Sequence, residues 1–388
     1  MSNIARSITS RRSFLGLGGI ASLATIAGAC AAPAPPAPPI TAAPTAGSRA
    51  AWEQEWDALV VAAKREGKVS IATLSGTGYA KWAEAFQKAF PGIEVQQQQY
   101  ASITAFAPKL LEERKAGVYE WDLLHGGYTL VLDQLRAANT LAPLKPLLVN
   151  RPDVAEDRNW LDGFEAGWLD RDRNLGYNFA VRVSLLAVNG DLVKDGEIKT
   201  VDDLTNPKWK GKIVWADVRS GFTSGPLAAT RIRRGDDLIK KLIIDQEPGF
   251  QRDNRLIAES LIRGKYAIAS GVTKSVLQTF LDAGEGKNIK FIDVPDYSIL
   301  ATSDTLWHTN NAPHPNAAKL LLNWTLTKEG QNVLREHGGV NSRRTDVAPA
   351  APEEAPKKGQ VYVPLGKEEY GNATGEMTQF LLKLLGQS

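Results

Sequence analysis

Apolar residues recur at helical spacing between residues 52 and 67, where the chain reads WEQEWDALVVAAKREG. Trp56, Leu59 and Ala63 fall on one face of such a helix, and Gly67 is a typical residue for its C-terminus. The next seven residues, KVSIATL, form an apolar run typical of a buried strand. The segment that follows, from SGTG to QQQQY, predicts a turn, a helix and a second strand. This order predicts an α/β fold with a largely parallel sheet.

The alternation of strands, turns and helices continues along the chain. Short apolar runs in EWDLLHGG, GKIVWADV and NIKFIDVP predict strands, and KYAIASGVTKSVLQTFLDAG predicts a strand, a turn and a helix. Farther on, NAAKLLLNWTLTKEGQNVLREHGG has the periodicity of two amphipathic helices, and EMTQFLLKLLGQ predicts a final helix. The sequence has no short-period repeat.

Small polar turns follow four of the predicted strands: SGTG, GGY, SGFTS and SGVTKS. In parallel α/β sheets, ligands bind beyond the carboxyl ends of the strands, where backbone N–H groups at helix starts hold polar or anionic groups. Turns of this composition also cap helices without touching a ligand. Because four such turns occur, we predict a ligand site that draws on Ser75, Gly76, Thr77, Tyr128, Ser220, Thr223, Ser224, Thr273 and Lys274.

The first 29 residues combine positive charge with an apolar stretch. Arg11 and Arg12 precede SFLGLGGIASLATIAGA, which is too short and too rich in glycine and alanine for a membrane span. SRRSFLG resembles a twin-arginine export signal, and a general secretory signal with a chance arginine pair is the alternative. We therefore predict that residues 1–29 are an export signal.

Cys30 is the only cysteine, which excludes an intrachain disulfide and a cysteine-based zinc or iron–sulfur site. It ends the sequence AGAC, which resembles the lipid-attachment motif of lipoproteins, although Ala27 stands where that motif prefers leucine or valine. Residues 30–50 are rich in proline and alanine, so they cannot form a core. We predict a lipid anchor at Cys30 followed by an extended linker; cleavage elsewhere in the alanine-rich stretch is the alternative.

The formal net charge of +3 belongs to this leader. Arg6, Arg11 and Arg12 precede Cys30, no acidic residue does, and the remaining residues carry 43 basic and 43 acidic side chains. A near-neutral body argues against general nucleic-acid binding. The hydrophobic fraction of 43% is that of an ordinary globular protein, and 388 residues accommodate two domains or one two-lobed unit.

Several segments of the body resemble the extracellular solute-binding proteins of ABC importers: WDALVVAAKREGKVSIAT, FQKAFPGIEV, VDDLTNPKWKGKIVWAD and HPNAAKLLLNWTLTKEGQNVLREHGGVNSRRTDV. The resemblance covers about residues 52–347 and is greatest to the ferric-iron, thiamine and polyamine binders of the type II periplasmic-binding class. It implies an α/β fold of two lobes, each a mixed sheet flanked by helices, with a ligand cleft at the hinge. Hinge crossings are implied near residues 178–189 and 293–306. The implied divisions are 52–177 plus 307–345 for lobe one, 186–292 for lobe two, and 346–388 for a tail of unassigned lobe.

This resemblance also implies that the protein captures a small molecule without catalysis and delivers it to a membrane permease and its ATPase. We expect no cofactor, no metal and no nucleic-acid partner, and a monomer. The expected location is the periplasm or the outer face of the cytoplasmic membrane, with a lipid anchor. A tethered sensor of the same fold and an exported enzyme are alternatives. The GxSxG and GxxxxGK[ST] motifs do not occur in the sequence, which argues against the enzyme.

Ferric members of the class use adjacent tyrosines after the strand that reads KYAIASG here, and Thr273 and Lys274 stand near that place. Fe³⁺ prefers hard anionic oxygen ligands, and a lysine adds repulsion, so iron binding through this motif is disfavoured. The four histidines are scattered without metal-binding spacing, at His125, His308, His314 and His337.

Polyamine and thiamine binders need other side chains. Cationic polyamines need carboxylates, for which Asp217 and Asp304 are candidates. Thiamine needs aromatic walls, which Tyr128, Phe222 and Trp307 could supply.

Two cationic residues favour an anion instead. Arg182 lies at the first crossing and Lys274 lies in a late turn. Arginine holds carboxylates, phosphonates and sulfonates with two parallel hydrogen bonds. We therefore favour an organic anion, or one that contains phosphorus or sulfur, as the ligand.

Overall fold

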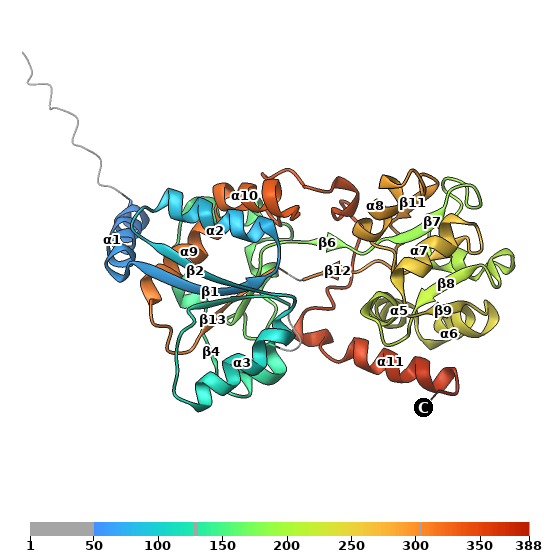
Figure 1. Cartoon of the computed structure of the whole chain (residues 1–388), viewed down its shortest axis with the longest axis horizontal. Helices are drawn as coiled ribbons and strands as arrows, with labels where there is room; N and C mark the ends of the chain where they lie inside the picture. The colour runs from blue at the N-terminus through green and yellow to red at the C-terminus, as the bar shows by residue number, and fades with distance from the viewer. Residues whose placement is uncertain (1–49, 128–130, 303, 388) are drawn as a thin grey trace, which may run out of the picture. The chain divides into compact units, whose positions relative to one another are not determined.

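The computed structural model describes residues 50–127, 131–302 and 304–387. The predicted export signal, Cys30, nearly all of the linker and Tyr128 therefore lie outside the described residues. None of the helices in the described residues combines the length and the apolar composition of a membrane span. The body contains two mixed β-sheets, each packed on helices, so the predicted α/β fold with mixed sheets is confirmed (Figure 1).

Lobe one is built on a sheet with the strand order β2-β1-β3-β13-β4, in which β5 also pairs with β13. β2, β1 and β3 run parallel, whereas β13 runs antiparallel to β3, β4 and β5. The strands are β1 (Lys68–Leu74), β2 (Glu94–Tyr100), β3 (Leu123–His125), β4 (Leu141–Ala142), β5 (Gly176–Asn178) and β13 (Thr305–Thr309). Because β13 comes from late in the chain, lobe one is completed only after lobe two.

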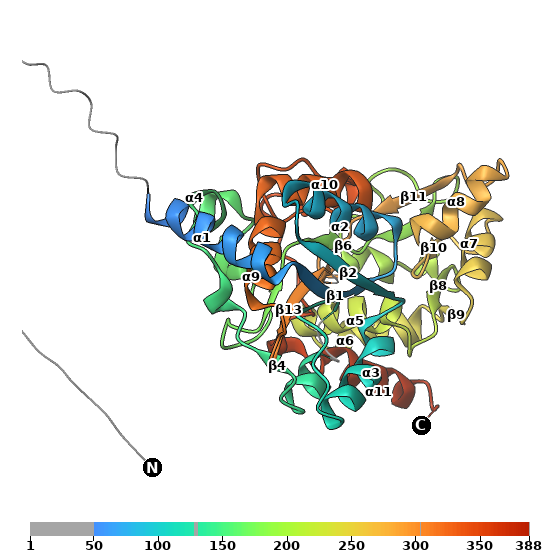
Figure 2. The same ribbon diagram turned by 60° about the vertical axis from the view of Figure 1, so that its left-hand side comes forward.

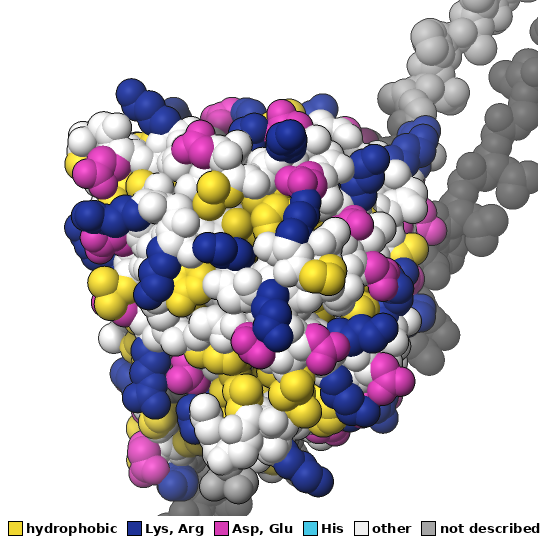
Figure 3. All heavy atoms as spheres, turned by 90° about the vertical axis from the view of Figure 1, so that its right-hand side faces the viewer, with side chains coloured by type: hydrophobic (Ala, Val, Ile, Leu, Met, Phe, Trp, Pro, Cys, Tyr) yellow, Lys and Arg dark blue, Asp and Glu magenta, His cyan; other side chains and the backbone are white. Residues whose placement is uncertain are grey.

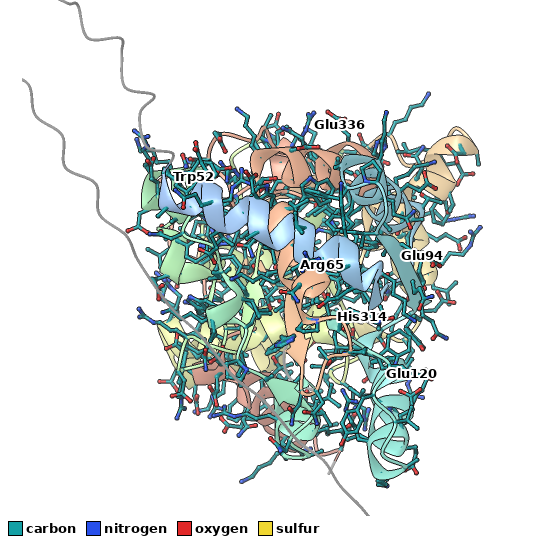
Figure 4. All side chains as sticks on the ribbon, turned by 90° about the vertical axis from the view of Figure 1, so that its left-hand side faces the viewer. Trp52, Arg65, Glu94, Glu120, His314 and Glu336 are labelled. Carbon is teal, nitrogen blue, oxygen red and sulfur yellow. The ribbon has the colours of Figure 1, made fainter. Side chains whose placement is uncertain are left out.

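Alternating residues of β1 face two helical layers, as expected for a buried strand. Val69 and Ile71 pack with α1, α2, α9 and α10, whereas Ala72 packs with α3. α1 lies across α9, and α2 lies beside α10 (Figures 2 and 4). The helices are α1 (Ala51–Glu66), α2 (Thr77–Ala89), α3 (Ile103–Lys115), α4 (Pro152–Ala155), α9 (Pro315–Leu326) and α10 (Lys328–Gly338).

Lobe two is built on a second sheet with the strand order β11-β7-β10-β8-β9. β10, β8 and β9 run parallel, and β7 runs antiparallel to both of its neighbours. The strands are β7 (Leu186–Asn189), β8 (Ile213–Ala216), β9 (Gly249–Gln251), β10 (Ile268–Ala269) and β11 (Ile289–Ile292). Trp215 and Ile268 pack with α5 and α6 on one face, whereas Val214 and Ala269 pack with α7 and α8 on the other.

The helices of lobe two are α5 (Gly221–Arg234), α6 (Asp236–Lys240), α7 (Asn254–Ile262) and α8 (Lys274–Asp282). The polar segment after β8, which the sequence predicts as a turn, is instead the start of α5. Thr223 donates its hydroxyl hydrogen to the carbonyl oxygen of Ala216, and Ser224 donates to that of Ser220. These bonds satisfy the hydroxyl groups inside the helix, so the polar residues do not end it. Basic and acidic side chains are interspersed over the outer face of lobe two, which has no broad patch of one sign (Figure 3).

A short antiparallel ribbon, which we call the hinge ribbon, joins the two sheets. β6 (Arg182–Val183) carries the chain toward lobe two, and β12 (Leu300–Ala301) carries it back (Figure 1). Arg182 pairs with Ala301, and Val183 pairs with Leu300. Each strand falls within one of the two crossing segments that the resemblance implies.

The tail after residue 345 follows a long path and ends in α11 (Ala373–Leu384). The sequence predicts this helix but not its lobe. Met377 and Leu381 of α11 are fully buried in the core that α5 and α6 form with the second sheet. α11 therefore belongs to lobe two, and it lies beside α5 (Figure 1).

Candidate functional site

A cavity of about 680 Å³ lies between the hinge ribbon and the adjoining edge of lobe two. β6 contributes Arg182 and Val183, and the starts of α5 and α8 contribute Ser220 and Lys274. Glu354 from the tail also lines the cavity. The cavity is therefore bounded by segments that lie far apart along the chain.

Two helix starts meet at this cavity because β8 and β10 are parallel neighbours, and each is followed by a helix. Ser220 caps α5 by accepting the N–H of Phe222 at 3.3 Å. Thr273 caps α8 by accepting the N–H of Val276, also at 3.3 Å. Helix N-termini carry unpaired N–H groups and a partial positive charge, so both ends favour a negative group. Ser220, Thr273 and Lys274, three of the predicted ligand contacts, all line this cavity.

One wall of the cavity is apolar and aromatic. Phe222 and Phe291 line it, together with the fully buried Tyr297. Tyr297 stacks on Trp215 with ring centroids 5.7 Å apart. Its hydroxyl lies near Ser270 but makes no hydrogen bond of normal geometry within the described residues. Burial raises the pKa of Tyr297, so its hydroxyl keeps its proton and remains a donor at neutral pH.

The two predicted cations, Arg182 and Lys274, both lie at the cavity, and both already contact carboxylates. Nε of Arg182 lies 3.2 Å from Oε2 of Glu354. Nζ of Lys274 lies 3.3 Å from Oε1 of the same residue and also pairs with Glu353. In this structure the positive charges are thus balanced by two neighbouring tail residues.

A polar cluster that the sequence does not predict lies in lobe one near the hinge. Oη of Tyr79 donates to Oδ1 of Asp304 at 2.6 Å, and Nε2 of His125 lies 3.3 Å from the same oxygen. Burial raises the pKa of Tyr79, and the charge of Asp304 raises it further, whereas Arg182 lowers it. The phenol therefore stays protonated at neutral pH. The turn SGTGY is the one sequence signal for Tyr79, because its partners are far away along the chain.

Several of the predicted ligand contacts do not line the cavity. Ser75, Gly76 and Thr77 are exposed at the carboxyl end of β1 and do not line it. Thr223 and Ser224 are fully buried in the bonds described above. Trp307 is also fully buried, and its Nε1 donates to the carbonyl oxygen of Gly126 at 3.2 Å. We therefore treat Thr223, Ser224 and Trp307 as packing residues rather than ligand contacts.

The two carboxylates that the sequence suggests for a cationic ligand, Asp217 and Asp304, contact other side chains. Asp217 pairs with Arg219 at 3.4 Å and with Arg252 at 3.1 Å, and these contacts fix it at the surface. Asp304 belongs to the Tyr79 cluster. Phe222, by contrast, does line the cavity. Among the described residues, no group of three or more His, Cys, Asp and Glu side chains is placed to hold a metal ion.

A second hollow, of about 570 Å³, lies beside the first residues of β1. His314 and Glu120 line it, and both appear on the face of lobe one in Figure 4. Nδ1 of His314 lies 2.9 Å from the wholly buried carboxylate of Asp122, which also accepts the N–H of Ser70. These contacts join β1, the segment before β3 and the start of α9, so we assign them a structural role.

The fold is similar to those of several solved periplasmic binding proteins. Iron-bound HitA from Pseudomonas aeruginosa matches with a TM-score of 0.57 at 17% identity, over 82% of this chain and 99% of HitA. The Trichodesmium protein IdiA (FutA), solved with iron and citrate, gives 0.63 at 15% identity, over 83% and 99%. AfuA from Actinobacillus pleuropneumoniae, solved with fructose-6-phosphate, gives 0.54 at 16%, over 83% and 99%. These structural matches show a shared two-lobed fold.

No curated protein matches the chain in sequence. The sequence profile of one protein family matches residues 81–360, which include the hinge ribbon, all of the second sheet and most of lobe one. Proteins of this family bind solutes outside the cytoplasm, which agrees with the resemblance of the sequence to ABC-importer components. The chain belongs to the bacterial extracellular solute-binding proteins.

Proposed function

We propose that this protein is the extracytoplasmic substrate-binding component of an ABC importer and that it captures a small organic anion. Carboxylates, phosphonates and sulfonates are the favoured headgroups. The observation that carries the proposal is the convergence of Arg182, Lys274 and the starts of α5 and α8 on one cavity. Closure of the two lobes at the hinge ribbon would enclose the ligand, and a permease with its ATPase would receive it.

The lining of the cavity supports an anion with an apolar body. The headgroup would bind at the helix starts, where N–H groups and two cationic side chains act together. Phe222 and Phe291 would contact the apolar part of the ligand. Such a division, mostly apolar with a few directed polar groups, is typical of small-molecule sites.

Calorimetry on wild-type protein and variants tests the anion proposal. A thermal-shift screen over organic acids, phosphonates, sulfonates, polyamines, thiamine and Fe³⁺ first selects the ligand class. Saturation at 100 times Kd stabilises the protein by about 2.7 kcal/mol, which the screen detects readily. Arg182→Ala and Lys274→Ala should then each weaken an anionic ligand by more than about tenfold, a loss of about 1.4 kcal/mol. Arg219→Ala, which removes an exposed arginine outside the cavity, is the control. Unchanged affinity in both cavity variants would refute the proposal.

Ferric iron is a second candidate because of the cluster in lobe one. A phenol, a carboxylate and an imidazole meet at Tyr79, Asp304 and His125, and Fe³⁺ accepts all three ligand types. The protonated state of Tyr79 counts against it, since iron needs the phenolate. Titration with ferric citrate separates the candidates: a visible phenolate-to-iron absorption band that Tyr79→Phe abolishes would favour iron over the anion.

Two further proposals concern export and delivery. We propose that Arg11 and Arg12 direct export through the twin-arginine pathway and that Cys30 carries a lipid. Mass spectrometry of the mature N-terminus checks the lipid, and Cys30→Ala should release the protein from membranes. A tethered sensor would use the same fold, and adjacent permease and ATPase genes distinguish the importer from it. Any exported enzyme would show turnover of the bound compound, whereas a binding protein returns it unchanged.

A further inference from the structure

We propose that Glu353 and Glu354 act as an internal counter-anion, which occupies the headgroup position of the cavity and which an anionic ligand must displace. This inference rests on the proposed anion-binding function. It adds a specificity element within the chain: only a ligand that holds Arg182 and Lys274 better than the two tail carboxylates do would bind.

The position of the two glutamates is the first argument. They lie in a short 3-10 helix, Pro352–Glu354, whose last residue lines the cavity. Glu354 contacts Arg182 and Lys274 together, so one carboxylate bridges the hinge ribbon and the start of α8. Of the described residues that line the cavity, Glu354 alone carries a negative charge. A ligand headgroup at the start of α8 would compete with it for the same cations.

The attachment of the surrounding tail is the second argument. Before the glutamates, Asn341 holds Ala351 through two hydrogen bonds, of 2.9 and 2.8 Å. After them, Asp293 accepts hydrogen bonds from Gln360 and Tyr362, and Lys357 pairs with it. The segment between residues 351 and 357 is thus fixed at both ends, and the glutamates can leave the cations while these anchors hold.

The exposure of the ion pairs is the third argument. The side chains of Arg182, Glu353 and Lys274 are 61%, 50% and 39% exposed, whereas that of Glu354 is 16% exposed, so each pair has at least one solvent-exposed partner. Exposed pairs of this kind contribute little to stability, because solvent screens them. An enclosed headgroup that also accepts N–H groups from α5 and α8 gains contacts that Glu354 lacks. Displacement of the glutamates by such a ligand is therefore favourable, and the glutamates reduce the apparent affinity in proportion to their occupancy.

Binding of phenylphosphonate, benzenesulfonate and benzoate, measured by calorimetry, tests the inference. These probes combine an apolar ring with the three favoured headgroups. The double variant Glu353→Gln with Glu354→Gln should bind the best probe at least about fivefold more tightly than wild type, because the competing charges are gone. Glu369→Gln removes the same charge from an exposed position of the tail and is the matched control, with unchanged affinity expected.

Hydrogen exchange supplies a second readout that does not depend on affinity. In wild type, probe binding should speed exchange in residues 353–356, since the glutamates leave their partners, while exchange at the start of α8 slows. Equal affinity in the double variant and wild type, with Arg182→Ala still weakening the probe, overturns the counter-anion and leaves the proposed function standing. Absence of binding to wild type, control and double variant overturns both.

Discussion

The role that the sequence suggests for Trp307 differs from its role in the structure. An aromatic residue near a hinge crossing is a reasonable candidate for stacking on a ligand, and the sequence offers no sign against it. In the structure, its indole ring packs on the backbone of Gly176 in the next strand, and it is fully buried. The close approach requires a residue without a side chain at position 176, and that pairing spans more than a hundred residues.

Gly176→Ala should therefore destabilise lobe one. An added Cβ would lie 2.3 Å from ring atoms of Trp307, so the ring or the strand must move. Overpacking of this kind costs about 1–3 kcal/mol. Urea unfolding followed by tryptophan fluorescence measures the loss. Gly127→Ala is the control, because a Cβ there meets nothing within 4 Å. Equal stability of the two variants would show that Trp307 has room to move.

The imidazole of His308 should make the stability of the protein depend on pH. Burial lowers the pKa of its imidazole, although a backbone contact at Pro143 and the charge of Asp122 partly oppose this. The unfolded chain then binds a proton more readily than the folded protein does, so the free energy of unfolding falls as pH drops through about 6.5. His308→Gln should reduce the slope between about pH 7 and 5.5, before most carboxylates titrate. Urea titrations at several pH values measure it, with the exposed His337→Gln as control. Identical slopes for wild type and His308→Gln would contradict the assignment.

Residues of the site were predictable where a local pattern marks them. Ser220, Thr273 and Lys274 come four or five residues after the ends of β8 and β10, and helix capping places them at the cavity. Glu354 and Tyr297 carry no such mark, because their place depends on the path of the chain after the hinge. The partners of Tyr79 are likewise distant, so neither spacing nor composition connects them. Local sequence thus identifies helix starts, whereas charge balance at the cavity is a tertiary property.

Among the elements, those with clear periodicity were predicted well. α1, α2, α9, α10 and α11 have apolar stripes, and β1 is a short apolar run, so the sequence alone indicates them. The start of α5 was predicted as a turn because its Gly, Ser, Thr and Pro residues are poor helix formers. The hydroxyl bonds of Thr223 and Ser224, which depend on burial against β8, reverse that preference. The lobe of α11 was not predictable, because an apolar stripe indicates that a helix packs on a surface but not which surface.

Leu381→Ala should destabilise lobe two through α11. The side chain is fully buried in the core with α5, and its truncation leaves a cavity. Loss of a buried leucine side chain costs about 2–5 kcal/mol. Thermal or urea unfolding measures the effect, and Gln379→Ala on the exposed side of the same helix should change little. A loss below about 1 kcal/mol would mean that α11 contributes little to the lobe it covers.

At the scale of the whole molecule, the two lobes have separate cores and share few covalent connections. All five strands of the second sheet lie between residues 186 and 292, the range that the family resemblance implies for lobe two. That resemblance could not describe the tail, which contacts both lobes in turn. Tail residues hold Asn341 of lobe one, then Asp293 at the end of lobe two, and then lobe one again at Leu169. The tail is therefore positioned to limit how the lobes move.

A substitution at Glu368 tests whether the tail limits the motion of the lobes. Its carboxylate accepts a hydrogen bond from Arg136 at 2.9 Å and from the N–H of Arg171 at 2.7 Å, both in lobe one. Five residues later α11 begins, and α11 is fixed to lobe two. Glu368→Ala should cost only about 1 kcal/mol of stability, because the pair is partly exposed. Its main effect should be a wider range of distances between the lobes, since one of the links that join them is lost.

Pulsed electron resonance between spin labels at Lys115→Cys and Asp237→Cys, one in each lobe, measures that range in ligand-free protein. We expect a broader distance distribution for Glu368→Ala than for wild type. Glu84→Ala, which breaks an exposed ion pair with Lys81 inside α2, is the control and should leave the distribution unchanged. If Glu368→Ala behaves like that control, the tail does not restrain the hinge, and the ribbon of β6 and β12 alone sets the motion. If the distribution broadens, the tail that carries Glu353 and Glu354 to the cavity also limits the opening of the cleft.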